Sequence, residues 1–442
     1  MLESIHAALW GAPTLALFLC VGFWFSARTG FFQLSHMPFW LKSTFGSLLK
    51  SGGSTGKKEI TPFQALSGAL AACMGTGNIV GVATAIILGG PGAIFWMWLS
   101  SILGMMTAFA ENTLGIKTRY RLADGEYMGG GMVILERGAG LKRTASLWCV
   151  LLVASSFGVG NMTQGNSAAA TLKESFGLAP AAVGITLAAL TVVVSAGGIK
   201  RVTKVAELVV PALSLIFLLG CLALIAVNIK ALPGALWAVL RGAKSPAAMR
   251  WGIARGVFSN EAGLGTAPLI HASASCKHPA EQGLWGIAEV FADTTVMCVI
   301  TGMAILCSGA YAAQGEGAAA VLCGNAFAST FGGAGRGFVA VALCVYAFGT
   351  LLGWSQYGGQ GMKYLLRGRG QRLYLALFAA AVFVGCVVKL ETVWLLSDIF
   401  NALMAFPNLL GIILLRREAL EELKKLGVKN MLNPLAFGGA LC

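Results

Sequence analysis

Two Gly-rich polar segments interrupt long apolar runs at corresponding places in the two halves of the chain. The first is residues 74–78 (MGTGN), and the second is residues 259–265 (SNEAGLG). Glycine costs a helix about 1 kcal/mol relative to alanine, and unpaired backbone groups in hydrocarbon cost several, so a broken helix persists at membrane depth only around a cavity. A matched pair of such breaks predicts a secondary transporter with a binding site near the middle of the bilayer.

The composition is that of a polytopic membrane protein. Hydrophobic residues make up 57% of the 442 residues and charged residues only 11%, whereas an ordinary soluble domain is roughly a quarter charged. The formal net charge is +14. The basic residues lie between the apolar runs and form no basic-aromatic patch, so the charge indicates membrane topology, and nucleic acid is not an expected partner.

Apolar stretches of about 20 residues can each cross the bilayer, and we expect eleven transmembrane helices. They lie near 8–27, 63–88, 91–117, 144–172, 178–196, 205–228, 249–273, 283–308, 336–364, 372–389 and 391–415. Most of the 32 Lys and Arg residues fall in loops on one side. The positive-inside rule therefore predicts an N-terminus outside the cell and a cytoplasmic C-terminus.

The predicted organisation is an inverted repeat. Setting aside the first helix leaves ten spans, which divide into two sets of five, and an odd number of spans inverts the second set relative to the first. We expect an accessory helix and cytoplasmic loop at 1–62, a first repeat at 63–228, an extracellular linker at 229–246, a second repeat at 247–416 and a cytoplasmic tail at 417–442. The fold class is an all-α membrane protein with two discontinuous helices.

The first break suits an anion and a cation together. An unwound turn at Gly75 to Asn78 would expose N–H groups at the start of a half-helix, where the helix dipole favours a carboxylate. The carbonyls of Ala71 and Met74 would face the cavity as ligands for a hard cation such as Na⁺. A glycine packing face explains this segment about equally well.

The second break adds polar groups that packing does not need, Asn260 and Glu261. Glu261 can hold a cationic group, carry a proton or pair with Arg255, and we favour the ion pair. In the fourth predicted span, Asn161 and Gln164 share a polar stripe at helical spacing with Ser167. We expect Gln164 to line a pathway, with interhelical hydrogen bonding as the alternative.

Several further residues are candidates. Thr350 is a plausible cation ligand, and Trp354 is large enough to close a pocket. Glu289 and Asp293 stand at i, i+4, a spacing typical of a proton relay, although we favour a structural role for both. The four His residues are dispersed, so the sequence does not favour a zinc site. The sequence contains no Walker loop, so we do not expect ATP to drive the process.

Six motifs together carry a resemblance to a known family. They are 75–78 (GTGN), 89–98 (GGPGAIFWMW), 197–201 (GGIKR), 255–265 (RGVFSNEAGLG), 283–286 (GLWG) and 397–403 (SDIFNAL). On these motifs the chain resembles the alanine or glycine:cation symporters, bacterial and archaeal transporters with a LeuT-like fold. The resemblance implies import of a small neutral amino acid, alanine or glycine, coupled to Na⁺ across the plasma or inner membrane.

The resemblance also implies roles for individual residues. The main-chain N–H groups of Thr76 and Gly77 would bind the substrate carboxylate, Gln164 would reach into the site, and Phe258 and Trp354 would limit side-chain size. Ser259 and Asn260 would lie at the substrate ammonium. The full expected substrate site is Thr76, Gly77, Asn78, Gln164, Phe258, Ser259, Asn260 and Trp354, and the expected Na⁺ ligands are Ala71, Met74 and Thr350.

The chain departs from the family pattern at Gly349, where a serine usually precedes Thr350. The ion therefore stays open, and a proton-coupled permease of the same fold is an alternative. A non-transporting sensor or a channel is the alternative from another class. No enzyme and no organic cofactor are expected, since no nucleophile-base pair is apparent. The choice between alanine and glycine, the D/L preference, the stoichiometry, the oligomeric state and a pairing of Cys307 with Cys323 are not determined by sequence.

Overall fold

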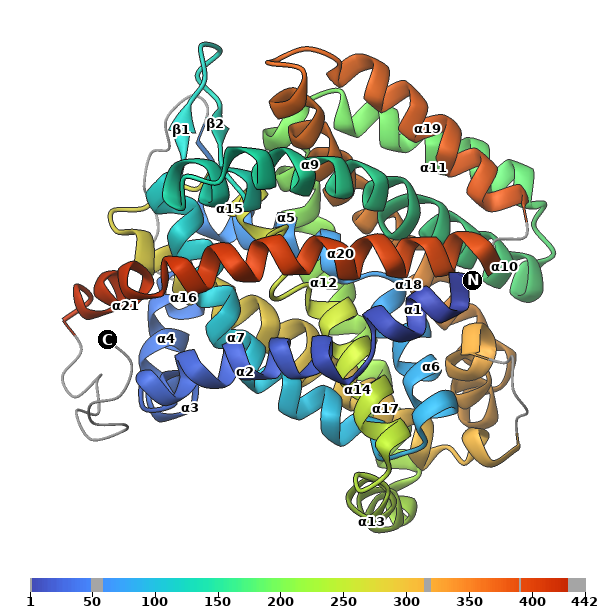
Figure 1. Cartoon of the computed structure of the whole chain (residues 1–442). Helices are drawn as coiled ribbons and strands as arrows, with labels where there is room; N and C mark the ends of the chain where they lie inside the picture. The colour runs from blue at the N-terminus through green and yellow to red at the C-terminus, as the bar shows by residue number, and fades with distance from the viewer. Residues whose placement is uncertain (1, 49–58, 314–318, 389–390, 428–442) are drawn as a thin grey trace.

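The computed structural model describes residues 2–48, 59–313, 319–388 and 391–427, which are almost entirely helical (Figure 1). Part of the predicted cytoplasmic loop (49–58) and the end of the predicted tail (428–442) lie outside the described residues. The N-terminal segment contains α1 (Leu2–Leu9), α2 (Ala12–Arg28), α3 (Phe32–Ser35), α4 (Met37–Ser43) and η1 (Phe45–Ser47).

The first half of the remaining chain continues with one broken helix and several long ones. Its elements are α5 (Pro62–Cys73), η2 (Thr76–Asn78), α6 (Val80–Gly89), α7 (Ala93–Thr118), α8 (Gly131–Val133), the π-helix η3 (Ile134–Gly138), α9 (Lys142–Phe157), the π-helix η4 (Gly158–Met162), α10 (Thr163–Phe176), α11 (Pro180–Ser195) and α12 (Gly198–Val227). A short antiparallel hairpin, β1 (Tyr120–Arg121) with β2 (Tyr127–Met128), follows α7 and pairs Tyr120 with Met128.

The second half begins after η5 (Ile229–Ala231) and α13 (Leu232–Gly242). It contains α14 (Pro246–Asn260), α15 (Ala267–His271), α16 (Pro279–Val290), the π-helix η6 (Phe291–Cys298), α17 (Val299–Cys307), η7 (Ala310–Ala313), α18 (Ala319–Leu365), α19 (Gln371–Val387), α20 (Glu391–Leu414) and α21 (Arg416–Lys424). α18 is kinked at Gly332.

The helices agree with a membrane-spanning fold. In the described part of the chain, seven helical stretches are long and apolar enough to cross a bilayer: Leu2–Arg28, Ala93–Thr118, Lys142–Phe176, Gly198–Val227, Pro279–Cys307, Val321–Leu365 and Val393–Leu414. The other predicted spans correspond to the two broken helices and to the shorter apolar helices α11 and α19. The total of eleven and the inverted repeat stay predictions.

From Leu208 onward, the exposed residues of α12 are apolar. Leu208 is 76% exposed, and Leu215, Ile216 and Leu219 are also exposed on this helix. A contiguous apolar surface of this kind marks an interaction site rather than a water-facing face, and on a long apolar helix it is typical of contact with lipid.

Both predicted breaks are present. α5 ends at Cys73, and the chain turns through Met74 and Gly75 before η2. α14 ends where Glu261 adopts a left-handed φ of 56°. Gly263 and Gly265 follow at φ 98° and 80°, values that glycine adopts without steric cost. Gly263 and Gly265 therefore allow the backbone conformation with which the chain leaves α14.

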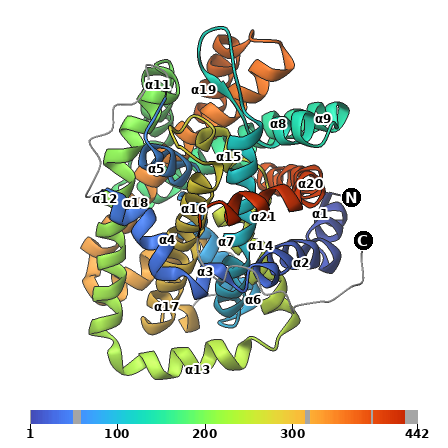
Figure 2. The same cartoon turned by 90° about the vertical axis from the view of Figure 1, so that its left-hand side faces the viewer.

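α9 and α20 run side by side, and the hairpin and α21 lie near one end of the molecule (Figure 1). α7 packs against both α14 and α16, which places it beside the second break. Much of the predicted linker 229–246 is the helix α13, which lies across one edge of the molecule (Figure 2), and its extracellular position stays a prediction. Trp96 Nε1 anchors the end of this segment by donating to Ala243 O at 2.8 Å. Cys307 and Cys323 are both free thiols.

Candidate functional site

The two breaks lie against each other in the interior. A Cβ added to Gly77 in η2 would lie 3.4 Å from the Cα and Oγ of Ser259, near the end of α14. All the predicted site side chains are buried, including those of Thr76, Asn78 and Ser259. Segments about 180 residues apart in the sequence thus form one closed site.

The first break lies between α10 and α18. A Cβ added to Gly75 would overlap Thr350 Oγ1 and would lie 2.9 Å from Gln164 Oε1. Gln164 Oε1 accepts the N–H of Thr76 at 3.1 Å. The structure therefore brings Thr76, Gln164 and Thr350 together around Gly75.

Two hydroxyls beside Gly75 lack partners. The Oγ1 atoms of Thr76 and Thr350 are buried, and neither has a hydrogen-bond partner in the part of the chain that the structure describes. Buried polar atoms are nearly always hydrogen-bonded, so an orphaned pair at one place needs a reason. A bound polar ligand or ion would supply the missing partners.

The end of α5 has the oxygen atoms that a cation needs. The amide of Gly75, which would continue the helix onto Ala71 O, donates instead to Asn78 Oδ1 at 3.1 Å. A Cβ added to Gly349 would lie 3.5 Å from that carbonyl of Ala71, so α18 passes directly beside it. Carbonyls at a helix C-terminus lack intrahelical partners. The carbonyl of Ala71 in α5 therefore faces α18, the helix that carries Thr350.

Asp293 contacts both breaks, as does Cys298, and the sequence favours only a structural role for Asp293. Asp293 Oδ1 accepts from Asn78 Nδ2 at 2.7 Å, and Asp293 Oδ2 accepts from Ser259 Oγ at 2.8 Å and from Thr294 Oγ1 at 2.6 Å. Asp293 is buried. Among the described residues, no Lys, Arg or His forms an ion pair with it. A buried carboxylate surrounded by donors, with no counter-charge, is suited to a positive ligand.

Glu289, one turn before Asp293, has a different partner. Glu289 Oε2 lies 3.0 Å from Nε2 of the buried His271 in α15. Gln282 Nε2 contacts the other ring nitrogen of His271. These contacts tie α15 to α16, in agreement with the structural role predicted for Glu289.

The predicted ion pair between Glu261 and Arg255 is wrong. Arg255 Nη2 lies 2.6 Å from Asp398 Oδ2 of α20, because its position within the helical part of α14 directs it toward that helix. Glu261 lies beyond the end of α14, where its Oε2 accepts from Thr266 Oγ1 at 2.6 Å and its Oε1 accepts from Trp354 Nε1 at 3.1 Å. Glu261 therefore fixes the second break and Trp354 together.

Trp354 packs on the backbone of η4. A Cβ added to Gly160 would overlap the Trp354 side chain. Phe258 lies on the same helix as Arg255, whose guanidinium carbon is 5.1 Å from the Phe258 ring centroid. Both aromatic residues are buried, as a role in limiting substrate size requires.

Asn260 is not brought to the first break. Its Oδ1 accepts the N–H of Ala262 at 3.0 Å, and its Nδ2 donates to Thr294 Oγ1 at 3.2 Å. Asn260 thus shapes the turn after α14 and holds Thr294, which in turn donates to Asp293. Its link to the site is indirect.

Glu111 of α7 is a residue that the sequence analysis did not single out. Its Oε1 accepts the N–H groups of Gly263 and Gly265 at 3.1 and 2.9 Å, and Asn408 Nδ2 at 2.5 Å. The backbone amides exposed by the second break are therefore satisfied by one carboxylate. An acidic residue within the apolar run 91–117 was the available signal.

Comparison with known proteins gives a consistent result. The family model described as the sodium:alanine symporter family matches residues 1–431. The sodium/alanine symporter AgcS of Methanococcus maripaludis is 38% identical, over 97% of this chain and 99% of that protein. An uncharacterized transporter of Haemophilus influenzae is 37% identical, over 96% of this chain and 95% of its own length.

A solved structure has the same fold. The crystal structure of MhsT in complex with L-phenylalanine aligns with a TM-score of 0.63 at 15% identity, covering 83% of this chain and 93% of that chain. At this identity the similarity concerns the fold alone. It agrees with the LeuT-like architecture expected from the motifs.

Proposed function

We propose, because the chain belongs to the sodium:alanine symporter family, that it imports a small neutral amino acid, alanine or glycine, together with Na⁺. The family consists of multi-pass membrane transporters, so the chain is a transporter and not an enzyme. The observation that carries the specific proposal is the meeting of both breaks at Asp293, a buried acidic residue that accepts hydrogen bonds from Asn78 and Ser259.

The proposed substrate site uses opposite charges at its two ends. The N–H groups of Thr76 and Gly77 would receive the carboxylate, with Gln164 turning from Thr76 N–H toward it. Asp293 would neutralise the positive charge that enters with the substrate, and the hydroxyl of Ser259 would accept a hydrogen bond from it. The zwitterion and the cation together would give partners to the buried hydroxyls of Thr76 and Thr350, which have none among the described residues.

The proposed Na⁺ site lies between α5 and α18. The carbonyl oxygens of Ala71 and Met74 and the hydroxyl of Thr350 are hard oxygen ligands of the kind that Na⁺ takes. Two observations support this placement: the close approach of Gly349 to Ala71 O, and the unsatisfied hydroxyl of Thr350. Gly349 contributes no hydroxyl, which keeps a proton-coupled permease as the second candidate.

The decisive experiment is uptake of labelled alanine and glycine by vesicles containing the purified protein. We expect accumulation above equilibrium only with an inward Na⁺ gradient, since the ion and the substrate complete one buried site. Uptake that follows a pH gradient and ignores Na⁺ would establish proton coupling instead. Equilibration without accumulation would favour a channel, and binding without uptake a sensor.

Thr350→Ala tests the ion site. Losing a hydroxyl ligand to a charged ion costs about 1.5 kcal/mol, so the Na⁺ concentration for half-maximal uptake is expected to rise roughly tenfold. The selectivity among amino acids should change little. Thr350→Ser keeps the hydroxyl and serves as the control. Equal Na⁺ dependence in the alanine variant and the wild type would remove Thr350 from the site.

Trp354→Ala tests the size filter. The variant removes the indole that packs on Gly160, and we expect uptake of larger amino acids such as leucine to appear. Trp354→Phe keeps an aromatic ring and loses only the donor to Glu261, so its substrate profile should stay close to that of the wild type. Competition by unlabelled amino acids measures both profiles, and an unchanged profile in the alanine variant contradicts the assignment.

A further inference from the structure

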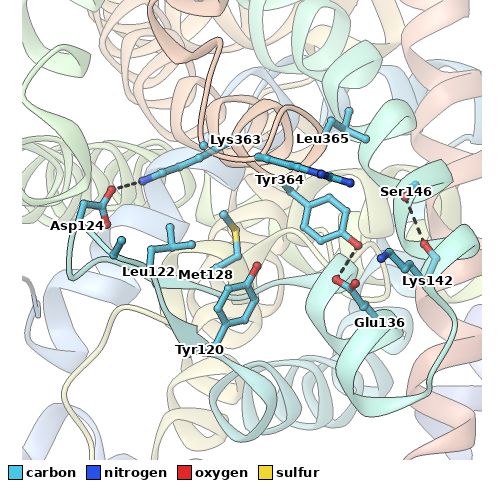
Figure 3. A pocket seen from close by; sticks show the side chains of 13 residues that line it. Tyr120, Leu122, Asp124, Met128, Glu136, Lys142, Ser146, Lys363, Tyr364 and Leu365 are labelled. Carbon is cyan, nitrogen blue, oxygen red and sulfur yellow. Dashed lines mark hydrogen bonds and ion pairs between the residues drawn. The ribbon is translucent and has the colours of Figure 1, made fainter.

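A second cavity lies away from the two breaks, at the end of the molecule that carries the hairpin. It has a volume of about 610 Å³, within the range of small-molecule sites, and its walls come from the β1–β2 hairpin, η3, the start of α9 and the end of α18 (Figure 3). The positive-inside rule predicts that this face is cytoplasmic. None of the residues that line it belongs to the proposed transport site.

The hairpin wall of this cavity is held firmly. Lys363 Nζ of α18 lies 2.6 Å from Asp124 Oδ2 and 2.8 Å from Glu126 Oε2 (Figure 3 shows the contact with Asp124). Arg119, just before β1, donates to the carbonyl oxygens of Ala272 and Ala274. The hairpin is thereby tied to both α18 and the segment after α15, so the cavity is preformed.

Charged groups of both signs face the cavity without a partner of opposite sign. Glu136 Oε2 accepts the hydroxyl of Tyr364 at 2.8 Å (Figure 3). In the described residues, Glu136 forms no ion pair, and neither does Lys142 at the start of α9 or Arg367 after α18. These three groups come from three separate elements and line one space. The cavity therefore offers one anionic and two cationic anchors.

The local backbone supports a functional reading of this space. Glu136 lies in the π-helix η3, and π-helical turns occur frequently at functional sites. Arg367 adopts a left-handed φ of 50° at the C-terminal cap of α18, where the N–H of Gly368 donates to Lys363 O at 2.7 Å. Burial, followed by the nearby Glu136 carboxylate, raises the pKa of Tyr120, which also lines this space.

We propose that this cavity binds a small zwitterion in which a primary ammonium lies a few bonds from an anionic oxygen group. Glu136 would receive the ammonium, and Lys142 and Arg367 would receive the anionic oxygens. Two sources have this chemistry. One is a free amino acid on the receiving side of transport, and this source rests on the proposed function. The other is the headgroup of phosphatidylethanolamine.

The test measures binding of labelled alanine to purified protein in detergent free of phosphatidylethanolamine, with and without Na⁺. Glu136→Gln removes the charge and keeps an acceptor for Tyr364. Glu174→Gln, an exposed carboxylate at the end of α10, is the matched control. If the ligand is an amino acid, the wild type and the control bind alanine at a Na⁺-independent site that Glu136→Gln weakens at least tenfold.

The lipid source gives a different pattern. No Na⁺-independent alanine site is then present in any of the proteins. Instead, after reconstitution with phosphatidylethanolamine, mass spectrometry of the intact protein should show at least fivefold less bound lipid for Glu136→Gln than for the control. If neither alanine nor lipid binding depends on Glu136 while the variant melts like the wild type, the proposal is overturned. Failure of the transport proposal appears separately, as absent Na⁺-driven uptake in the wild type.

Discussion

Asp293→Asn is expected to abolish Na⁺-driven uptake of alanine while leaving the protein folded. Asp293 is buried, accepts hydrogen bonds from both breaks and has no basic partner among the described residues. Removing one member of a buried charge pair costs about 3–5 kcal/mol, so the loss of the carboxylate should weaken binding of its positive ligand at least about 100-fold. Initial uptake rates over ranges of alanine and Na⁺ concentration measure the effect.

The melting temperature separates this role from a structural one. Without ligand, an unpaired buried carboxylate is a cost to the folded state, so the asparagine variant should be as stable as the wild type or more stable. Added alanine and Na⁺ should stabilise the wild type and should not stabilise the variant. Asp293→Glu keeps the charge and should recover part of the uptake. A variant that transports normally, or that simply unfolds, contradicts the assignment.

The breaks themselves could be predicted from sequence because their signal is local. Glycines and amides inside an apolar run have few explanations at membrane depth, and both predicted breaks are present in the structure. The positions of Thr76 and Gln164 around Gly75 also agree with the expectation that they share one site.

The partners of the acidic residues could not be predicted for two physical reasons. Glu289 and Asp293 seemed to share a helix face at i, i+4, but η6 is a π-helix, whose turn differs from the α-helical turn that the spacing assumes. Asp293 therefore meets Asn78, whereas Glu289 meets His271. The ion pair of Arg255 with Asp398 joins residues 143 positions apart, a relation that no local pattern contains.

The polar stripe in the fourth predicted span was only partly interpretable. Asn161 and Gln164 appeared equivalent by spacing, yet Asn161 Nδ2 donates to Phe378 O at 2.7 Å, while Gln164 reaches the first break. Asn161 lies within the π-helix η4 and Gln164 within α10, so they are rotated onto different neighbours. One residue thus makes the interhelical bond that was the alternative, and the other lies where a pathway lining was expected.

Gly75→Ala is the second substitution with a large expected effect, because the first break leaves no space for a methyl group. The new Cβ would overlap Thr350 Oγ1 and press on Gln164 Oε1, which forces these side chains out of their present positions at the turn. Overpacking of a buried position costs typically about 1–3 kcal/mol, and here the displaced groups are the proposed ion and substrate ligands, so we expect uptake to fall at least tenfold.

Gly81→Ala is the matched control for this effect. It lies six residues later in α6, where an added Cβ would approach only Thr76 O, at 3.9 Å, so the same chemical change there should leave uptake close to that of the wild type. The comparison uses equal amounts of protein in the vesicles and the same alanine and Na⁺ gradients. Equal loss in both variants would mean that the helix tolerates no alanine anywhere, whereas full activity of Gly75→Ala would show that the turn at Gly75 does not hold the ligands of the site.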